Sequence, residues 1–352
     1  MSTLTEQTAS NLRQRYDELL AEQPKLRIRD AALALQVSEA ELVALDCGDS
    51  VTRLSVDNWS EFVKELKPLG RVMVLTRNEH CVHEKTGEYE NIAAHGGKIG
   101  LVTGKVIDLR LFYDEWDLAF AVESKGRDGA SLRSFQVFDA AGQAIHKVYL
   151  KNETGLDAYQ AIVEKYRSID QSTEQIVGSA PALEEDQPVS EATAKSFLDG
   201  WSQLKDTHDF YPLLGKHKVS RLQSMVLAEG RFTQKVSNDT AKRVLELASE
   251  RGISIMVFVG NEGAIQIHTG PVNKIVGYGE WINVIDPDFN LHLKEPGIVS
   301  SWIVEKPTVD GVVHSLEIYD NQGRIIAQFF GARKPGIEER QDWRDLVAEL
   351  KA

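Results

Sequence analysis

The stretch SFQVFD at residues 134–139 recurs as SLEIYD at residues 315–320, and this recurrence decides the organisation of the chain. Both stretches are rich in aromatic and β-branched side chains, which favour strands. Each ends in an aspartate that is followed three residues later by a glycine, Gly142 in the first and Gly323 in the second. Because Asp and Gly tolerate the backbone angles of tight turns, both places predict a strand that enters a hairpin.

Two further anchors extend the recurrence over a whole module. VSEAELV at residues 37–43 corresponds to VSRLQSM at residues 219–225, an offset of 220 − 38 = 182. VLTRNE at residues 74–79 corresponds to VFVGNE at residues 257–262, an offset of 261 − 78 = 183. The offset is too long for a solenoid repeat and indicates two similar domains in tandem.

The domain limits follow from composition between the copies. GSAP at residues 178–181 and EEDQP at residues 184–188 are small, acidic or proline residues without apolar periodicity, which is typical of an exposed linker. We therefore expect an N-terminal module at residues 1–170, a linker at 171–192 and a C-terminal module at 193–352. A chain of 352 residues is also too long for one ordinary core.

The same order of elements is predicted in both modules. Each should open with helices, continue as a run of strands and close with a helix, which defines an α+β fold with a large antiparallel sheet flanked by helices. The predicted helices are residues 29–37, 39–45, 59–66, 155–167, 240–250 and 338–351. The predicted strands are residues 72–75, 104–111, 118–123, 132–138, 253–259, 282–293, 301–305 and 312–319.

Composition narrows the class of protein. The net charge of −13 argues against a large nucleic-acid footprint, because phosphate binding needs clustered Lys and Arg. No apolar run reaches the ~20 residues of a membrane-spanning helix, and residues 1–15 are polar and unlike a signal peptide. Cys47 and Cys81 form no disulfide framework. These features predict a cytoplasmic protein that does not insert into membranes.

A chemical site that only one copy carries should appear where the copies differ, and His208 is such a place. The offset of 182 puts Leu26 at the matching position of the first copy. Thr207 is the expected N-cap of a helix that begins at His208, and Asp206 or Asp209 would fix the tautomer of the ring. The alternative is a surface histidine at a helix start.

Basic residues also break the repeat. Arg221 replaces Glu39 of the first copy and Lys306 replaces Ser124, while Arg333 follows the strand at residues 325–330. Such cations, unless they are ordinary solvated surface charges, predict an anionic ligand that is bound mostly by the second copy. The first copy adds Arg110, at a position that is uncharged in the second. Four phenylalanines on predicted strands would supply apolar walls or else belong to the core: Phe112, Phe258, Phe329 and Phe330.

Two other interpretations compete with this one. Residues 29–42 resemble a helix-turn-helix, but Glu39 and Glu41 of its second helix would face DNA phosphates, so nucleic acid is an unlikely partner. A metal site at His80, Cys81, His83 and His95 lacks the spacing of tetrahedral ligands. No glycine-rich nucleotide-binding motif follows a predicted strand, so any reductant would come from a partner.

DTHDF at residues 206–210, followed by KHKVSR at residues 216–221, resembles the haem-ligand region of the cytoplasmic HemS/HmuS-type proteins, also called haemin-degrading factors. The resemblance covers nearly the whole chain, including its duplication. It implies haem b in a cleft between the halves, with His208 as the axial ligand of the iron and Arg110 on the opposite face. It also implies polar contacts to the propionates from Arg221, Lys306, Gln328 and Arg333, and apolar contacts from Phe112 and Phe258. Phe330 is a departure, because some relatives have tyrosine there. His83 is a candidate for a secondary haem contact.

Two functions follow from the resemblance. The first is a carrier that accepts imported haem, with an inner-membrane haem importer as donor, and passes it to a haem oxygenase. The second is an enzyme that opens the porphyrin with oxygen and an external electron donor such as a reductase. No sequence feature separates them. Haem needs an imidazole for iron, cations for two propionates and apolar walls. His208 and the basic residues that break the repeat would supply the first two, and the phenylalanines of the predicted strands would supply the third.

Overall fold

The computed structural model describes residues 2–126, 129–180, 182, 186–334 and 336–351, and for residues 2–10 it describes the backbone alone. The chain forms two compact units. The first unit comprises Met1–Arg77, Lys85–Pro181 and Asn261–Ile265, and the second comprises Asn78–Glu84, Ala182–Gly260 and Gln266–Ala352. Each unit therefore contains a short segment from the other half of the sequence, which the predicted contiguous domain limits do not include.

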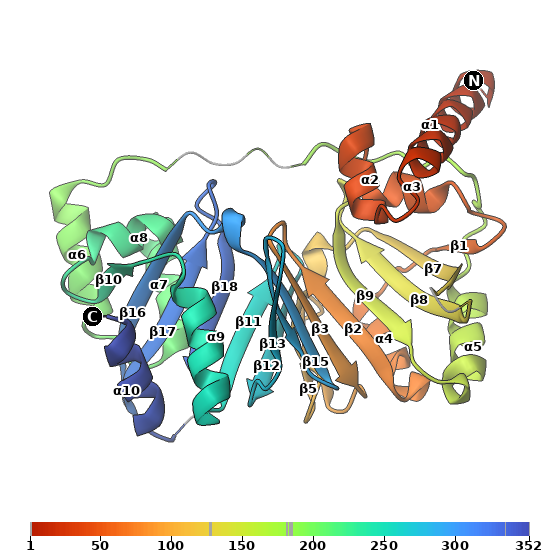
Figure 1. The fold of residues 1–352 in the computed structure, drawn as a ribbon. Coiled ribbons are helices and arrows are strands. Elements are labelled where there is room, and N and C mark those ends of the chain that lie inside the picture. The colour runs from red at the N-terminus through yellow and green to blue at the C-terminus, as the bar shows by residue number, and fades with distance from the viewer. Residues whose placement is uncertain (1, 127–128, 181, 183–185, 335, 352) are drawn as a thin grey trace. The chain divides into compact units, whose positions relative to one another are not determined.

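The first unit begins with helices and continues as strands (Figure 1). Its helices are α1 (Ser2–Glu22), α2 (Ile28–Leu35), α3 (Glu39–Ala44), α4 (Trp59–Glu65) and α5 (Leu156–Tyr166), with 3-10 turns η1 (Lys67–Leu69), η2 (Tyr113–Glu115) and η3 (Glu153–Gly155). Its strands are β1 (Val51–Leu54), β2 (Val72–Arg77), the end of β3 (Cys81–Gly87), β4 (Ile92–His95), β5 (Ile99–Thr103), β6 (Asp108–Phe112), β7 (Leu118–Lys125), β8 (Ser131–Phe138) and β9 (Ala144–Leu150).

The second unit repeats this series. Its helices are α6 (Glu191–Trp201), α7 (Phe210–His217), α8 (Arg221–Leu227), α9 (Thr240–Arg251) and α10 (Gln341–Leu350), with 3-10 turns η4 (Thr207–Asp209) and η5 (Glu295–Gly297). Its strands are β10 (Thr233–Val236), β11 (Ile255–Gly260), most of β12 (Ala264–Gly270), β13 (Ile275–Tyr278), β14 (Trp281–Ile285), β15 (Phe289–Lys294), β16 (Ser300–Thr308), β17 (Gly311–Tyr319) and β18 (Ile325–Gly331).

The strand order is the same in both units. In the first it runs β1-β7-β8-β9-β2-β3, and β6, β5 and β4 follow one another outward from β12, whose first residues belong to this unit. In the second it runs β10-β16-β17-β18-β11-β12, and β15, β14 and β13 follow one another outward from β3, whose first residues belong to this unit. The paired strands are antiparallel, for example β7 with β8 and β16 with β17. The predicted α+β class and tandem duplication are confirmed.

Register and backbone conformation show the duplication residue by residue. Gln136 pairs with Lys147 across β8 and β9, and Glu317 pairs with Gln328 at the equivalent place across β17 and β18. Among the described residues, the non-glycine residues with positive φ are Gln36 and Lys218, at 57° and 53°. They cap α2 and α7 at positions exactly one repeat apart, with the offset 218 − 36 = 182.

Helices cover the sheet of the second unit on both faces. Along α9 and α10 the apolar side chains pack against β11, β17 and β18, where Trp343 and Phe329 are fully buried. Figure 1 shows these two helices in front of the strands. Phe329 thus belongs to the core and is no ligand wall. The opposite face is covered in part by α6, α7 and α8 through a cluster that includes Phe197, Trp201 and Phe210.

Several predicted elements differ from the observed ones. The strand predicted at residues 104–111 begins only at Asp108, because Gly104 donates its N–H to the carbonyl of Ile107 and forms a turn. The strand predicted at 282–293 is interrupted in the same way, where Asp286 donates to Phe289. Helix α1 was not predicted, since its apolar residues are few and widely spaced.

Most of the segment expected as a linker, residues 171–192, is irregular. The described residues between 171 and 190 form no helix or strand, and α6 begins at Glu191. Pro181, Leu183, Glu184 and Glu185 lie outside the described residues. The guanidinium of Arg53 holds the start of the linker through the carbonyls of Ser172 and Glu174. Cys47 and Cys81 are buried free thiols. Among the described residues, no helix is both long enough and apolar enough to span a bilayer.

Candidate functional site

The turn that carries His208 is shaped by two aspartates. Oδ1 of Asp206 accepts the backbone N–H of His208 at 2.8 Å, and Oδ2 of Asp209 accepts the backbone N–H of Asp206 at 3.0 Å. This reciprocal capping box satisfies backbone donors at the start of η4 and leads into α7. The N-cap is therefore Asp206, and the prediction of Thr207 was wrong because the aspartate one residue earlier is the better acceptor for this turn.

The same aspartate orients the imidazole. Nδ1 of His208 lies 2.6 Å from Oδ1 of Asp206, and the His208 side chain is 87% exposed. The hydrogen bond from the His208 backbone, together with the His208 ring, lowers the pKa of Asp206, so the carboxylate stays ionised. A proton held on Nδ1 leaves the lone pair of Nε2 available, and no described residue bonds that nitrogen. This arrangement is the one that ring nitrogens adopt when they ligate metals.

Three of the predicted polar residues meet at one buried carboxylate that the sequence analysis missed. Arg221 donates from Nε and Nη2 to both oxygens of Glu317, at 2.9 and 2.8 Å. Nζ of Lys306 lies 2.9 Å from Oε1 of Glu317, and Nε2 of Gln328 lies 3.1 Å from it. The hydroxyl of Tyr319 donates to Oε2 at 2.7 Å. We call these five residues the Glu317 cluster.

The Glu317 cluster carries one positive charge more than it neutralises, since two cations share one carboxylate. Burial by itself would raise the pKa of Glu317, but Arg221 and Lys306 outweigh burial and hold that pKa well below its usual value. Burial lowers the pKa of Lys306, whose side chain is 3% exposed. The Arg221 side chain is about a quarter exposed, so it offers the cluster's surplus charge to an anion at the surface.

Phe210 connects the cluster to the histidine turn. Phe210 is the first residue of α7, and both cations of the cluster lie over its ring. The ring centroid is 5.4 Å from the guanidinium carbon of Arg221 and 4.7 Å from Nζ of Lys306. Cation–π contacts of this kind stabilise desolvated cations. Because Phe210 follows His208 by two residues, the imidazole and the surplus charge belong to one continuous piece of the second unit.

A half-exposed face of the sheet adjoins the cluster. Phe258 of β11 is the cross-strand partner of Gln328, and Phe330 lies two residues further along β18 on the same face. The Phe258 and Phe330 rings meet edge to face, with 5.2 Å between their centroids. Neither ring is fully buried. Two aromatic rings beside a polar cluster offer an apolar surface with a charged edge.

Arg333 lies apart from the cluster. Its Nη2 is 3.1 Å from Oδ2 of Asp310, just beyond β16, and its charge contributes to the lowered pKa of Asp206. The turn η4 contacts β16, and the carbonyl of Lys205 accepts the backbone N–H of Val309. Arg333 is therefore near the histidine turn rather than beside Glu317.

The two predicted residues of the first unit share one face of β6. Asp108, Arg110 and Phe112 alternate along the strand and are all partly exposed, whereas Leu109 and Leu111 are buried. Arg110 forms an ion pair with Asp108, and its side chain is about one-third exposed. The guanidinium is thus oriented on its own strand and keeps donors for another partner.

In the first unit the equivalents of the Glu317 cluster have different charges. Glu39, Gln136 and Lys147 occupy the positions of Arg221, Glu317 and Gln328. Lys147 pairs with Glu39, and both side chains are buried. Comparison of the repeats therefore contains a signal for Glu317, because its equivalent in the first copy is the uncharged Gln136.

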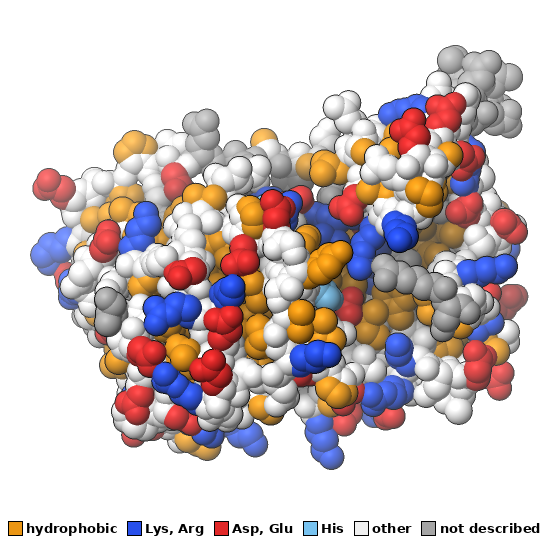
Figure 2. Space-filling model, viewed as in Figure 1, with side chains coloured by type: hydrophobic (Ala, Val, Ile, Leu, Met, Phe, Trp, Pro, Cys, Tyr) orange, Lys and Arg blue, Asp and Glu red, His pale blue; other side chains and the backbone are white. Residues whose placement is uncertain are grey.

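The competing interpretations fail in particular ways. Glu39 is buried against Lys147, so at this residue the second helix of the expected helix-turn-helix packs on its own module rather than facing a partner. His83 is fully buried in β3, so its ring is not a contact for an external haem. Within the described ranges, no group of three or more His, Cys, Asp and Glu residues is placed to hold a metal ion. Over α9 and α10 the surface mixes acidic and basic side chains and presents no basic stripe (Figure 2).

Comparison with known proteins agrees with this fold. A family model described as the haemin-degrading HemS.ChuX domain matches residues 36–166 and 218–350, once in each repeat. The hemin transport protein HmuS of Yersinia pestis is 35% identical over 347 residues, which cover 97% of this chain and 97% of that protein.

Solved structures give the same result. Holo-PhuS, a heme-binding protein from Pseudomonas aeruginosa, is 44% identical with a TM-score of 0.92, over 98% of this chain and 99% of that one. The heme degrading enzyme ChuS of Escherichia coli O157:H7 is 33% identical with a TM-score of 0.88, over 98% and 100%. Fold and matches define a tandemly duplicated protein of haem utilisation. The chain belongs to the haemin-degrading HemS/ChuX family.

Proposed function

We propose that the chain is a cytoplasmic carrier that binds haem b through His208, accepts it after import across the inner membrane and passes it to haem-degrading machinery. The observation that carries the proposal is the geometry of His208. An exposed imidazole has one nitrogen held by an ionised carboxylate and the other available. Haem would supply the iron that this second nitrogen binds.

The anionic edge of haem fits the rest of the second unit. A propionate would meet the surplus positive charge of the Glu317 cluster through Arg221, with Lys306 and Gln328 fixing Glu317 from below. Arg333 would meet a second carboxylate nearer the histidine turn. Phe258 and Phe330 would contact the macrocycle. We propose Arg110 and Phe112 of the first unit as further haem contacts, with the guanidinium donating to a ligand of the iron.

The more similar relatives favour the carrier function. PhuS, at 44% identity, is a heme-binding protein, and HmuS, at 35%, is a hemin transport protein. Porphyrin oxidation is the second candidate, because ChuS at 33% identity is described as a heme degrading enzyme. That reaction would require a reductase as partner, whereas the carrier requires a haem oxygenase as acceptor.

The first experiment tests the histidine. Purified protein is titrated with ferric haem and followed in the visible spectrum, for the wild type and for His208→Ala. We expect the variant to lose affinity by more than the roughly 10–100-fold that an outer-shell change costs, and to lose the wild-type Soret band. His95→Ala, an exposed histidine on β4, is the matched control and should bind as the wild type does. An unchanged titration of His208→Ala would refute the ligand assignment.

The second experiment separates carrier from enzyme. The haem complex is exposed to an electron donor in air with catalase present, so that free peroxide is removed. A carrier keeps its haem intact and transfers it to an acceptor such as apo-haem oxygenase. Release of a linear tetrapyrrole under these conditions would sink the carrier and establish the degrading enzyme.

A further inference from the structure

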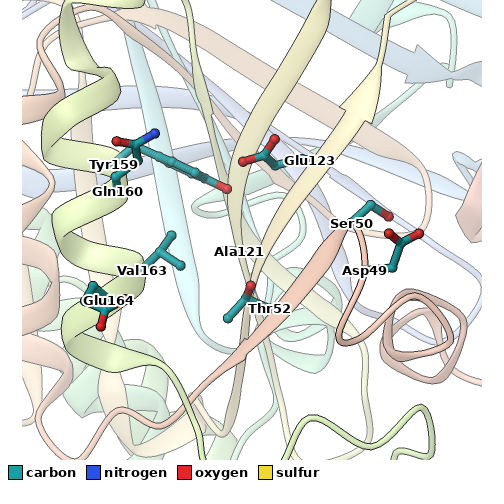
Figure 3. A pocket seen from close by; sticks show the side chains of 9 residues that line it. All are labelled: Asp49, Ser50, Thr52, Ala121, Glu123, Tyr159, Gln160, Val163 and Glu164. Atoms are coloured by element: carbon teal, nitrogen blue, oxygen red, sulfur yellow. The ribbon is translucent and has the colours of Figure 1, made fainter.

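A small cavity in the first unit has no part in the proposed haem chemistry. It has a volume of about 220 Å3 and lies between α5 and the strands β1 and β7 (Figure 3). Pockets for drug-sized ligands span roughly 300–1,000 Å3, so an occupant of this one must be small. Its wall combines three carboxylates with hydroxyl and amide groups over a small apolar floor; the lining residues are Asp49, Ser50, Thr52, Ala121, Glu123, Tyr159, Gln160, Val163 and Glu164.

Tyr159 is the feature that marks the cavity as a ligand site. The residue is 2% exposed, and its ring packs on Phe135 with 4.7 Å between centroids. Figure 3 shows its hydroxyl pointing from α5 toward Glu123. Among the described residues the hydroxyl has no hydrogen-bond partner. Burial, and then the charge of Glu123, raises the pKa of Tyr159, so the phenol stays protonated and is able both to accept and to donate a hydrogen bond.

The second unit shows what fills the equivalent place. In the first unit Thr52 pairs with Ala121, and in the second Gln234 pairs with Ile303 at the equivalent place. Two residues further along β7 and β16, Glu123 therefore corresponds to Glu305. There the chain fills the position with its own lysine. Lys351 places its ammonium on Glu305, and the Lys351 carbonyl accepts from Nε2 of Gln234 at 2.9 Å.

Among the described residues of the first unit, no lysine pairs with Glu123. The residue that follows α5 is Arg167, and it forms no ion pair among the described residues. Nε of Arg133 lies 3.6 Å from Oε1 of Glu123. In the second unit, Nε2 of His314 lies 3.8 Å from Oε1 of Glu305 in the same way. The side of Glu123 that faces the cavity is left to solvent, and Asp49 and Glu164 add negative charge at the rim.

We propose that this cavity binds a small organic cation with a primary ammonium group, seated between Glu123 and the hydroxyl of Tyr159 as the Lys351 ammonium is seated on Glu305. The ammonium donates to the carboxylate and to the phenolic oxygen, and a short alkyl chain lies on Ala121 and Val163. Anions are excluded by the three carboxylates. The site is independent of haem and requires nothing from the second unit.

The test uses n-butylammonium chloride, which reproduces a lysine side chain, on the haem-free full-length protein labelled with 15N. At constant ionic strength, we expect saturable amide shifts confined to β1, β7 and α5. Constant ionic strength keeps general screening unchanged between samples. 1-Butanol has the same chain without the charge and should produce no such saturation.

Two conservative variants locate the ion. Glu123→Gln should raise the dissociation constant about tenfold or more, equivalent to about 1.4 kcal/mol, and Tyr159→Phe should raise it severalfold while keeping the ring against Phe135. Glu61→Gln, an exposed carboxylate of α4, should leave it unchanged. Wild-type-like shifts elsewhere in the spectrum establish that each variant is folded. The proposal would be overturned if the wild type showed no saturable shifts. It would also be overturned if Glu123→Gln and Tyr159→Phe both bound n-butylammonium as tightly as the wild type does.

Discussion

Oδ1 of Asp206 receives two hydrogen bonds from His208, one from its backbone N–H at 2.8 Å and one from its ring Nδ1 at 2.6 Å. One carboxylate oxygen thus fixes both the backbone and the ring of the residue proposed as iron ligand. The two roles can be separated by mutation, because Asp209 completes the same capping box without touching the ring.

Asp206→Asn should therefore weaken haem binding about 10–100-fold, the cost typical of losing an outer-shell partner of a metal-binding histidine. The amide keeps the shape of the carboxylate but not its charge, so its oxygen accepts a weaker hydrogen bond from Nδ1. Asp209→Asn perturbs the same turn and should leave haem affinity within a few-fold of the wild type. Haem titration of both variants measures the difference, and equal losses would mean that only the turn matters.

Glu317→Gln should lower the free energy of unfolding by about 3 kcal/mol or more, because Arg221 and Lys306 would remain desolvated beside a neutral amide. The folded-state pKa of Glu317 is lowered, so its contribution is complete above about pH 4.5 and declines as the pH falls toward the folded value. The free energy of unfolding of the second unit is measured by denaturant unfolding, with hydrogen exchange of the β17 and β18 amides as the probe.

Lys306→Met separates stability from ligand binding. It removes the surplus charge but keeps the Arg221–Glu317 pair, so its cost in unfolding free energy should stay under about 1 kcal/mol. Haem affinity should nevertheless fall, since the cluster is then neutral. If the variant lost stability as Glu317→Gln does, the cluster would need both cations to fold; if it bound haem normally, the surplus charge would have no role in haem binding.

His146 should make the first unit sensitive to mild acid. Burial lowers its folded-state pKa to about 3 from an ordinary 6.5, while Thr76 and Tyr89 hydrogen-bond the ring at 3.0 and 2.9 Å. The stability it contributes is complete above pH 6.5 and is lost as the pH falls toward 3, by about 1.4 kcal/mol per unit. Hydrogen exchange in β9 between pH 7 and 5 should show this slope, and His146→Gln should abolish it. An unchanged slope in the variant would assign it to another group.

Gln36 and Lys218, which have left-handed backbone conformations one repeat apart, predict stabilising substitutions. Lys218 ends α7 with φ of 53°, a conformation that costs a non-glycine residue about 1 kcal/mol and costs glycine little. Lys218→Gly should raise the free energy of unfolding by up to about 1 kcal/mol, and Gln36→Gly should do the same in the first unit. Lys242→Gly, within α9, should lower it by about 0.5–1 kcal/mol. Thermal unfolding of the three variants compares them.

Local pattern and repetition determined much of this protein from its sequence. The recurrence of residues 134–139 at 315–320 predicted the duplication, the hairpin turns at Gly142 and Gly323 and most of the strands, because periodicity and turn chemistry act between near neighbours. The difference between the copies also singled out His208, Arg221 and Lys306. Asp206 was named as a partner of the ring, which the 2.6 Å contact confirms.

Only the tertiary structure decided how those residues are used. Arg221 and Glu317 are 96 residues apart in sequence, and nothing local indicates that one buried carboxylate takes up Arg221, Lys306 and Gln328 together. The same holds for the exchanged segments at residues 78–84 and 261–265 and for the cavity beside Tyr159. Pairing of buried charges depends on which side chains the packed sheet brings within about 3 Å, and that distance is a property of the folded chain.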